Sequence, residues 1–259
     1  MPPAPVKSAA RVLDVLELLA QQPQPLPHSE IAQALGMPKS SLSELLTVLE
    51  ARGYIGMEAD RYRLGPALLS LAGTLLRRTD VARVAQPIIA SLMLRTGESA
   101  AVVLRQGTEV VVVCKENCDQ PILVSAQLGE RAPINNSAGG KAIMAFLPKH
   151  EQEAWLASGK LRRMTPQSVT DPDAMRRELA AIARGGISYS REAMFPGIVA
   201  MGLPVFDAVG NPCAGVSVAV PASRFDKARE TRVAEALRAA AADISAALGF
   251  KKNGRRSAA

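Results

Sequence analysis

Apolar residues recur at helical spacing on both sides of one break, at Gly36-Met37-Pro38, within the stretch from Ser29 to Arg52. A leucine stripe marks one face of the second predicted helix, and it consists of Leu42, Leu45, Leu46 and Leu49. Gly36 suits the left-handed conformation that ends a helix, and Pro38 suits the first turn of the next one. The pattern predicts a helix-turn-helix, whose second helix can enter a DNA major groove. An ordinary helical hairpin in a core is the alternative for this segment taken alone.

Two short alternating segments follow the second helix and favour DNA binding over that alternative. Residues 53–58 and 61–64 flank the acidic turn Glu58-Ala59-Asp60, and Gly65-Pro66 ends the second segment. Two strands around a turn, placed here, are typical of the wing of a winged helix. Upstream, Val6 to Gln22 reads as an amphipathic helix beneath the helix-turn-helix, and the proline-rich residues 22–27 read as an extended connection.

A nearly all-apolar helix is predicted from Ala67 to Arg78. Its leucines lie on several sides of the helix, and they are Leu68, Leu69, Leu71, Leu75 and Leu76. A helix without a polar face is normally covered, and we expect a second copy of the chain to cover it. The expected organisation is a DNA-binding domain over 1–66, a linker and dimerisation helix over 67–80, and a second domain over 81–250. Residues 251–259 form a basic tail that we expect to be disordered.

Strands and helices mix without an internal repeat in the second domain. Strands are predicted at 99–104, 109–114, 122–126, 187–191, 199–206 and 213–220. Helices are predicted at 81–95, 138–146, 149–158, 173–184 and 228–248. This mixture predicts an α+β fold in which helices cover an antiparallel sheet.

Composition limits the class of protein. Apolar residues make up 48% of the 259 residues, but no run approaches the roughly 20 apolar residues that span a bilayer. Asp14 and Glu17 interrupt the first apolar helix, which excludes a signal-peptide core, so we expect a cytoplasmic protein. The three cysteines, Cys114, Cys118 and Cys213, are then expected to be reduced.

Net charge lends DNA binding no support. The chain carries +7 overall, yet residues 1–66 are close to neutral. Their basic residues are Lys7, Arg11, Lys39, Arg52, Arg61 and Arg63, and their acidic residues are Asp14, Glu17, Glu30, Glu44, Glu50, Glu58 and Asp60. The prediction therefore depends on motif geometry, with phosphate contacts from a few placed cations and helix N-termini.

A set of motifs now identifies a resemblance that covers about residues 6–249. In chain order they are AARVLDVLELLA, LGMPKSSLSELLTVLEARGY, RYRLGPALL, GGKAIMAFLP, VTDP, PGIVAMGLPVFD and GVSVAVPASRF. Together they resemble the isocitrate lyase regulator (IclR) family of bacterial transcription factors. The resemblance implies a winged helix-turn-helix, a GAF-like effector domain, and dimers that often pair into tetramers.

The candidate DNA-reading residues lie opposite the leucine stripe, and they are Lys39, Ser40, Ser41, Ser43, Glu44 and Thr47. Ser41 matches a Ser or Thr that the family uses near DNA. The family commonly has His or Tyr followed by Arg where this chain has Ser43 and Glu44, so the expected guanine reader is missing. Glu44 could accept from a cytosine amino group or be a solvated helix charge. The candidate phosphate contacts are Lys39, Arg52, Arg61 and Arg63, with ordinary surface charge as the alternative for each.

The resemblance also implies an effector site. Its candidate residues are Asn135, Ser137, Ala138, Gly139, Ser190, Glu192, Ala200, Ser217 and Ala219. Members that bind small 2-oxo acids tend to carry Asp, Cys and Ser where this chain has Ser190, Ala200 and Ala219, and a frequent His is Asn135 here. With these anchors absent and helix amides left to hold a carboxylate, we expect an acid with an apolar or aromatic part rather than glyoxylate or pyruvate. A pocket with no physiological ligand is the alternative.

Other chemistry fits the sequence poorly. Gly139-Gly140-Lys141 lacks the earlier glycine and the Ser or Thr of a phosphate-binding loop. Cys114 and Cys118, with only two histidines in the chain, make no closed zinc set. No nucleophile elbow is present, so we expect neither an enzyme nor a cofactor. The sequence predicts a ligand-responsive regulator of operator DNA, repressor or activator. The alternative is a ligand-sensing module whose N-terminal helices serve protein assembly.

Overall fold

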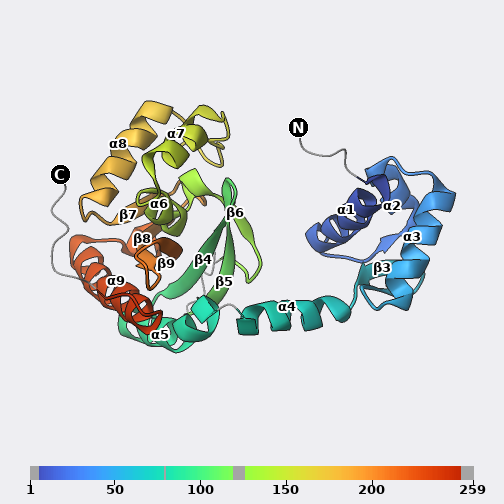
Figure 1. Cartoon of the computed structure of the whole chain (residues 1–259), viewed down its shortest axis with the longest axis horizontal. Coiled ribbons are helices and arrows are strands. Elements are labelled where there is room, and N and C mark those ends of the chain that lie inside the picture. The colour runs from blue at the N-terminus through green and yellow to red at the C-terminus, as the bar shows by residue number, and fades with distance from the viewer. Residues whose placement is uncertain (1–5, 79, 119–125, 252–259) are drawn as a thin grey trace. The chain divides into compact units, whose positions relative to one another are not determined.

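The computed structural model describes residues 6–78, 80–118 and 126–251, which form two compact units divided after Arg78 (Figure 1). Side chains are not described for residues 73–80. The expected strand at 122–126, apart from Ala126, and the basic tail beyond Lys251 lie outside the described residues.

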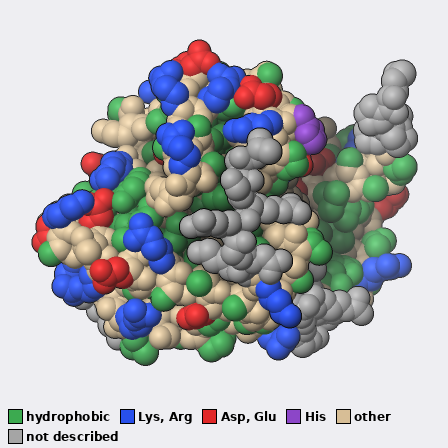
Figure 2. All heavy atoms as spheres, turned by 60° about the vertical axis from the view of Figure 1, so that its left-hand side comes forward, with side chains coloured by type: hydrophobic (Ala, Val, Ile, Leu, Met, Phe, Trp, Pro, Cys, Tyr) green, Lys and Arg blue, Asp and Glu red, His purple; other side chains and the backbone are tan. Residues whose placement is uncertain are grey.

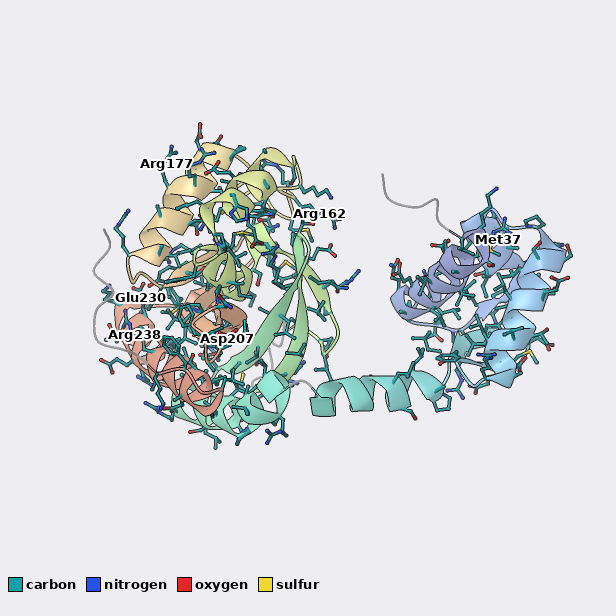
Figure 3. All side chains as sticks on the ribbon, viewed as in Figure 1. Met37, Arg162, Arg177, Asp207, Glu230 and Arg238 are labelled. Carbon is teal, nitrogen blue, oxygen red and sulfur yellow. The ribbon has the colours of Figure 1, made fainter. Side chains whose placement is uncertain are left out.

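Six regular elements precede the linker helix in the N-terminal unit. They are α1 (Lys7–Gln21), β1 (Leu26–Pro27), α2 (His28–Leu35), α3 (Lys39–Ala51), β2 (Ile55–Glu58) and β3 (Arg61–Leu64). Gly36 has φ 58° and ψ 34° at the end of α2, the left-handed conformation that the sequence predicted. Met37 follows it and is 7% exposed between α2 and α3 (Figure 3). The helix, turn, helix and wing are therefore present in the predicted order.

The sheet of this unit contains a strand that the sequence did not predict. Its order is β1-β3-β2, all antiparallel, with Leu26 opposite Tyr62. A two-residue strand has no periodicity of its own, so the sequence predicts only an extended connection here. The wing turn between β2 and β3 places Ala59 at φ 48° and Asp60 at φ 58°, as a two-residue type I′ hairpin requires.

Helix α4 (Ala67–Arg78) occupies the predicted linker segment. Leu69 is 75% exposed and Leu71 is 55% exposed in the single chain. Ala67 and Leu68 are half-buried, but the chain itself leaves Leu69 and Leu71 uncovered.

The C-terminal unit contains a six-stranded antiparallel sheet in the order β6-β5-β4-β9-β8-β7. Its strands are β4 (Ser99–Gln106), β5 (Glu109–Glu116), β6 (Arg131–Pro133), β7 (Ser188–Arg191), β8 (Ile198–Phe206) and β9 (Pro212–Pro221). Its α-helices are α5 (Asp80–Thr96), α6 (Ala138–Met144), α7 (Lys149–Ala157), α8 (Pro172–Ala183) and α9 (Lys227–Ala247), and the 3₁₀ turns are η1 (Ile134–Asn136) and η2 (Ala222–Arg224). The short strand β6 was not predicted. The other described elements lie within a few residues of the predicted ranges.

Helices cover both faces of this sheet, α5 and α9 on one and α6, α7 and α8 on the other (Figure 1). Alternate strand residues point to opposite faces. Val102, Val216 and Val218 pack against α5 and α9, whereas Val103 and Val110 pack on the side of α6 to α8.

Helix α6 lies in backbone contact with the sheet. A Cβ atom at Gly215 would lie 2.3 Å from the carbonyl oxygen of Gly139, and one at Gly202 would lie 2.5 Å from the carbonyl carbon of Ala138. No side chain fits at either position. The glycines therefore hold the N-terminal end of α6 against β8 and β9.

Candidate DNA-binding and effector sites

The outward face of α3 carries the residues that the sequence singled out. Leu42, Leu46 and Leu49 are at most 4% exposed beneath it. The exposed residues on the other side include Lys39, Ser40, Ser43, Glu44 and Thr47, while Ser41 is half-buried. The polar side of α3 is therefore open to solvent in this chain, as a DNA-reading helix requires.

Two hydroxyls on this face bond back to the helix. Ser43 Oγ donates to the Lys39 carbonyl at 2.9 Å, and Thr47 Oγ1 donates to the Ser43 carbonyl at 2.9 Å. Nε2 of His28, the first residue of α2, lies 3.0 Å from Ser43 Oγ. The sequence reasoning did not select His28, because the contact spans two helices.

The four candidate phosphate contacts divide into two pairs. Arg61 Nη1 donates to the Pro25 carbonyl at 3.2 Å, and Arg63 Nε lies 3.4 Å from the Glu58 carboxylate. Lys39 and Arg52 are exposed and form no ion pair with any residue of the described chain. The second pair can meet a phosphate without giving up an internal partner.

A cavity of about 110 Å³ lies in the C-terminal unit, on the sheet face that also carries α6. Its apolar wall is contributed by four strands, β4, β5, β8 and β9, and by one loop, and it includes Ala101, Val103, Val110, Val112, Ala200, Ala219, Met194, Phe195 and Ile198. Its polar rim includes Ser99, Lys115, Glu116, Asn117, Asn136, Ser137, Ser190 and Ser217. An apolar space with a few polar groups is the usual form of a small-molecule site.

Six of the nine candidate effector residues line this cavity, namely Ser137, Ala138, Ser190, Ala200, Ser217 and Ala219. Ser137 caps α6 by accepting from the Gly140 amide at 3.1 Å. Ser190 Oγ donates to the Asn136 carbonyl at 2.6 Å, which ties β7 to the turn before α6. Both hydroxyl oxygens thus have defined positions at the cavity.

The structure places Asn135, Gly139 and Glu192 outside the cavity lining. The Asn135 side chain donates to two carbonyls, of Arg162 at 2.8 Å and Val169 at 3.0 Å. Gly139 faces the sheet backbone, as described above. Glu192 has φ 53° and accepts from the Gly197 amide at 2.8 Å. These three residues hold loops and layers in place and do not line this cavity, and their part in an effector site stays a prediction.

Several lining residues were missed. Asn136, next to Asn135, lines the cavity, although the side chains of both asparagines donate to the Arg162 carbonyl. Ser99 could have been found, since it alternates with Ala101 and Val103 along one strand face. Met194 and Phe195 lie in an irregular loop that no periodicity marks.

Glu116, at the cavity rim, connects to helix α5. Its carboxylate accepts from the side-chain amide of Gln86, and Cys114 Sγ donates to the Gln86 oxygen at 2.8 Å. Burial, reinforced by the negative charge of Glu116, raises the pKa of Cys114 to about 11. The thiol is therefore held neutral.

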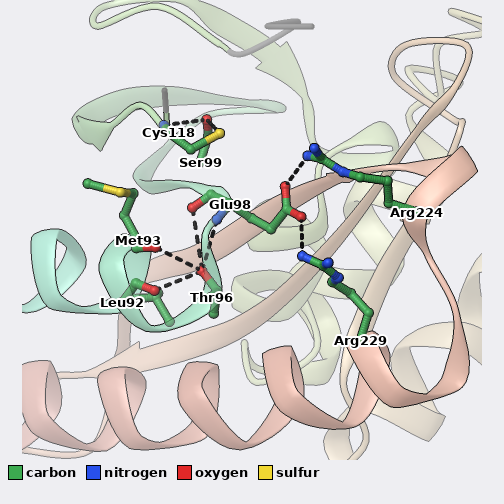
Figure 4. Close-up of polar contacts among 8 residues, drawn as sticks. All are labelled: Leu92, Met93, Thr96, Glu98, Ser99, Cys118, Arg224 and Arg229. Atoms are coloured by element: carbon green, nitrogen blue, oxygen red, sulfur yellow. Dashed lines mark hydrogen bonds and ion pairs between the residues drawn. The ribbon is translucent and has the colours of Figure 1, made fainter. Parts of the chain in front are cut away.

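A second connection, which we call the Glu98 clamp, consists of Glu98, Arg224 and Arg229 (Figure 4). Glu98 is 1% exposed, and each carboxylate oxygen accepts from one guanidinium at 2.8 Å. The next residue is Ser99, whose Oγ accepts from the Cys118 amide at 3.2 Å. The clamp ties the beginning of β4 at the cavity to η2 and the first turn of α9.

Lys141 of α6 is a buried cation, 2% exposed. Its Nζ donates to the Glu178 carboxylate and to the Tyr189 carbonyl, both at 2.5 Å. Burial lowers the pKa of Lys141, while Glu178 acts in the opposite direction. The side chain joins α6 to α8 and to β7, which is an edge strand of the sheet.

Charged side chains are scattered and mixed in sign over the face shown in Figure 2. None of the described helices has both the length and the apolar character needed to cross a membrane. Within the described ranges, no three His, Cys, Asp or Glu side chains gather in a way that could hold a metal ion.

Comparison with known proteins matches both units to one family. Residues 8–57 match the IclR helix-turn-helix domain, and residues 73–246 match the C-terminal domain of the bacterial transcriptional regulator IclR. The HTH-type transcriptional repressor AllR of Klebsiella pneumoniae is 30% identical over 93% of this chain and 89% of its own. The IclR structure from Thermotoga maritima is 30% identical, with a TM-score of 0.78 over 95% of this chain and all of that one. An IclR homologue from Microbacterium hydrocarbonoxydans, complexed with 4-hydroxybenzoate, is 25% identical, with a TM-score of 0.82 over 93% of this chain and 98% of its own.

Proposed function

Since the chain belongs to the IclR family of bacterial transcriptional regulators, we propose that a small organic acid with an apolar or aromatic body controls its binding to operator DNA in the cytoplasm. The family assigns DNA binding to the N-terminal unit and ligand binding to the C-terminal unit. This assignment decides against the alternative in which the N-terminal helices serve protein assembly alone.

The cavity carries the proposal for the effector. Its volume of about 110 Å³ is of the same order as the roughly 150 Å³ of an apolar cavity that holds benzene in another protein. Valine and alanine side chains would contact a ring, and Lys115 with the hydroxyls of Ser99 and Ser137 would meet a carboxylate at the rim. The similar Microbacterium protein bound to 4-hydroxybenzoate supports an acid of this class.

For DNA, we propose that α3 enters the major groove of a half-site. Ser40, Ser41, Glu44 and Thr47 would face base edges, and Lys39 and Arg52 would meet phosphates. A second copy would cover the exposed leucines of α4, because a regulator with two heads reads two half-sites spaced by the helical repeat. Size-exclusion chromatography with light scattering tests the dimer or tetramer, and a monomeric chain would refute it.

Titration calorimetry tests the effector class. We expect benzoate and 4-hydroxybenzoate to bind, and glyoxylate and pyruvate to bind at least tenfold more weakly. Ala200→Leu fills the cavity and should abolish binding, whereas Ala181→Leu, on the exposed side of α8, should not. Tight glyoxylate binding with none for the aromatic acids would refute the proposed class.

A gel-shift assay with the DNA upstream of the protein's own gene tests operator binding. The same assay with each bound acid gives the sign of the response. A coupling of about 1–3 kcal/mol would change operator affinity by several-fold to about a hundredfold. An affinity that the bound acid leaves unchanged would refute control by that acid.

A further inference from the structure

The hydroxyl protons at two positions of the α3 outward face are used within the helix. Thr47 Oγ1 donates to the Ser43 carbonyl, and Ser43 Oγ donates to the Lys39 carbonyl, each at 2.9 Å. A hydroxyl group has one proton to donate. Neither residue can donate to a base without breaking a bond that the free helix already makes.

Ser43 is further committed by His28. Because the Ser43 proton goes to Lys39, the 3.0 Å contact with His28 Nε2 requires the imidazole to donate and Ser43 Oγ to accept. This contact joins the first residue of α2 to the middle of α3. Ser43 is therefore a positioning residue, which fixes the two helices to each other rather than reading a base.

Thr47 presents a different group to the outside. Its Cβ carries a hydroxyl and a methyl, and the hydroxyl is turned back along the helix to the preceding turn. The residue is exposed, and with its proton used the hydroxyl can only accept, so the Cγ2 methyl is the group available for an apolar contact. A methyl group offers no hydrogen bond and matches only an apolar part of a base edge.

The major groove has one such part, the C5-methyl group of thymine. We propose that Thr47 reads a thymine through its methyl group and thereby determines specificity at that base pair. The proposal rests on the proposed entry of α3 into the major groove.

The test begins with a duplex selected from a randomised pool by the full-length protein. Each thymine is then replaced, one at a time, by deoxyuridine, which lacks only the C5-methyl group. Removing one methyl contact should weaken binding by about fourfold at one position in each half-site. Other thymines should tolerate the replacement.

Two variants separate the methyl from the hydroxyl. Thr47→Ser keeps the hydroxyl and loses the methyl, and it should bind the thymine and deoxyuridine duplexes equally. Thr47→Val keeps a methyl and loses the hydroxyl, and it should retain the fourfold preference. Thr231→Ser is the matched control, because Thr231 Oγ1 makes the same backbone bond, to the Lys227 carbonyl at 3.0 Å, on an exposed turn of α9.

The proposal is overturned if deoxyuridine lowers the duplex affinity of the wild type at no thymine position by more than Thr231→Ser changes that affinity. It is also overturned if Thr47→Ser keeps the preference, or if Thr47→Val loses it, since the hydroxyl would then be the reader. Failure of the wild type to select any duplex would overturn the proposed DNA-binding function itself. The two failures are distinguishable, because failure of DNA binding would abolish duplex binding by every variant, whereas failure of the methyl contact would leave duplex binding intact.

Discussion

Gly215→Ala tests how the contact between α6 and the sheet shapes the effector cavity. The added Cβ would lie 2.3 Å from the Gly139 carbonyl oxygen, 2.7 Å from its carbon and 2.8 Å from its Cα. All three are backbone atoms, so no side chain can rotate away. Ordinary contact begins at 3.4 Å. Because packed interiors leave no spare room, α6 must move away from β9 by about 1 Å.

The stability cost follows from overpacking, which is typically about 1–3 kcal/mol. With backbone on both sides we expect the upper end, about 3 kcal/mol. For a unit of this size, each kcal/mol lowers Tm by about 2–4 °C, so scanning calorimetry should show a loss of roughly 6–12 °C. Since Ser137 and Ala138 at the start of α6 line the cavity, aromatic acids should also bind at least tenfold more weakly.

Two other glycines provide controls for Gly215→Ala. Gly97 has φ +70° with no atom near its missing Cβ, so Gly97→Ala introduces only backbone strain, about 1 kcal/mol. Gly56 has ordinary φ and open space, so Gly56→Ala should be nearly neutral. The reasoning is refuted if Gly215→Ala melts within about 1 °C of the wild type and binds the acids unchanged.

Three further predictions concern charge, thiols and the wing. Glu98→Gln removes the counter-charge of two guanidinium groups and should lower the free energy of unfolding by about 1–3 kcal/mol in urea titrations. The exposed Glu153→Gln should change it much less, because surface ion pairs contribute little, and equal effects would contradict the clamp. Burial raises the pKa of Cys114 and Cys213 from 9.0 to about 11. Iodoacetamide at pH 8 should therefore label both thiols about a hundredfold more slowly than in the unfolded protein. Rapid labelling of the native protein would contradict this. Because only the unfolded state ionises these thiols between pH 9 and 11, their contribution to stability should fall across that window. Ala59→Gly relieves a left-handed alanine and should stabilise the N-terminal unit by about 0.5–1 kcal/mol in thermal melts; a loss of stability would show that the turn is not strained.

The helix-turn-helix could be predicted from sequence because its signals are local. The leucine stripe of α3 and the glycine that ends α2 each specify conformation within one or two turns of chain. Strands β1 and β6 were missed for the opposite reason, since two or three residues are too few to show alternation. Their existence depends on a partner strand that lies far away in sequence.

The candidate effector site shows the same division. Family motifs pointed to strand positions such as Ala200 and Ser217, and a strand fixes which alternate residues share a face. They did not identify Asn136, which lines the cavity next to the predicted Asn135. They also gave no sign that the Glu192 carboxylate accepts from the Gly197 amide within its own loop. Orientation in turns depends on contacts that a linear pattern does not contain.

The Lys141 side chain has a consequence for how copies of this protein can join. An exposed border strand invites another chain to add to the sheet. Here the Lys141 ammonium group donates to the Tyr189 carbonyl and pairs with Glu178. A strand added beside β7 would have to displace this buried cation to bond to that carbonyl. Strand addition at Tyr189 is therefore disfavoured, and we expect copies of the chain to join through helical surfaces such as the exposed leucines of α4.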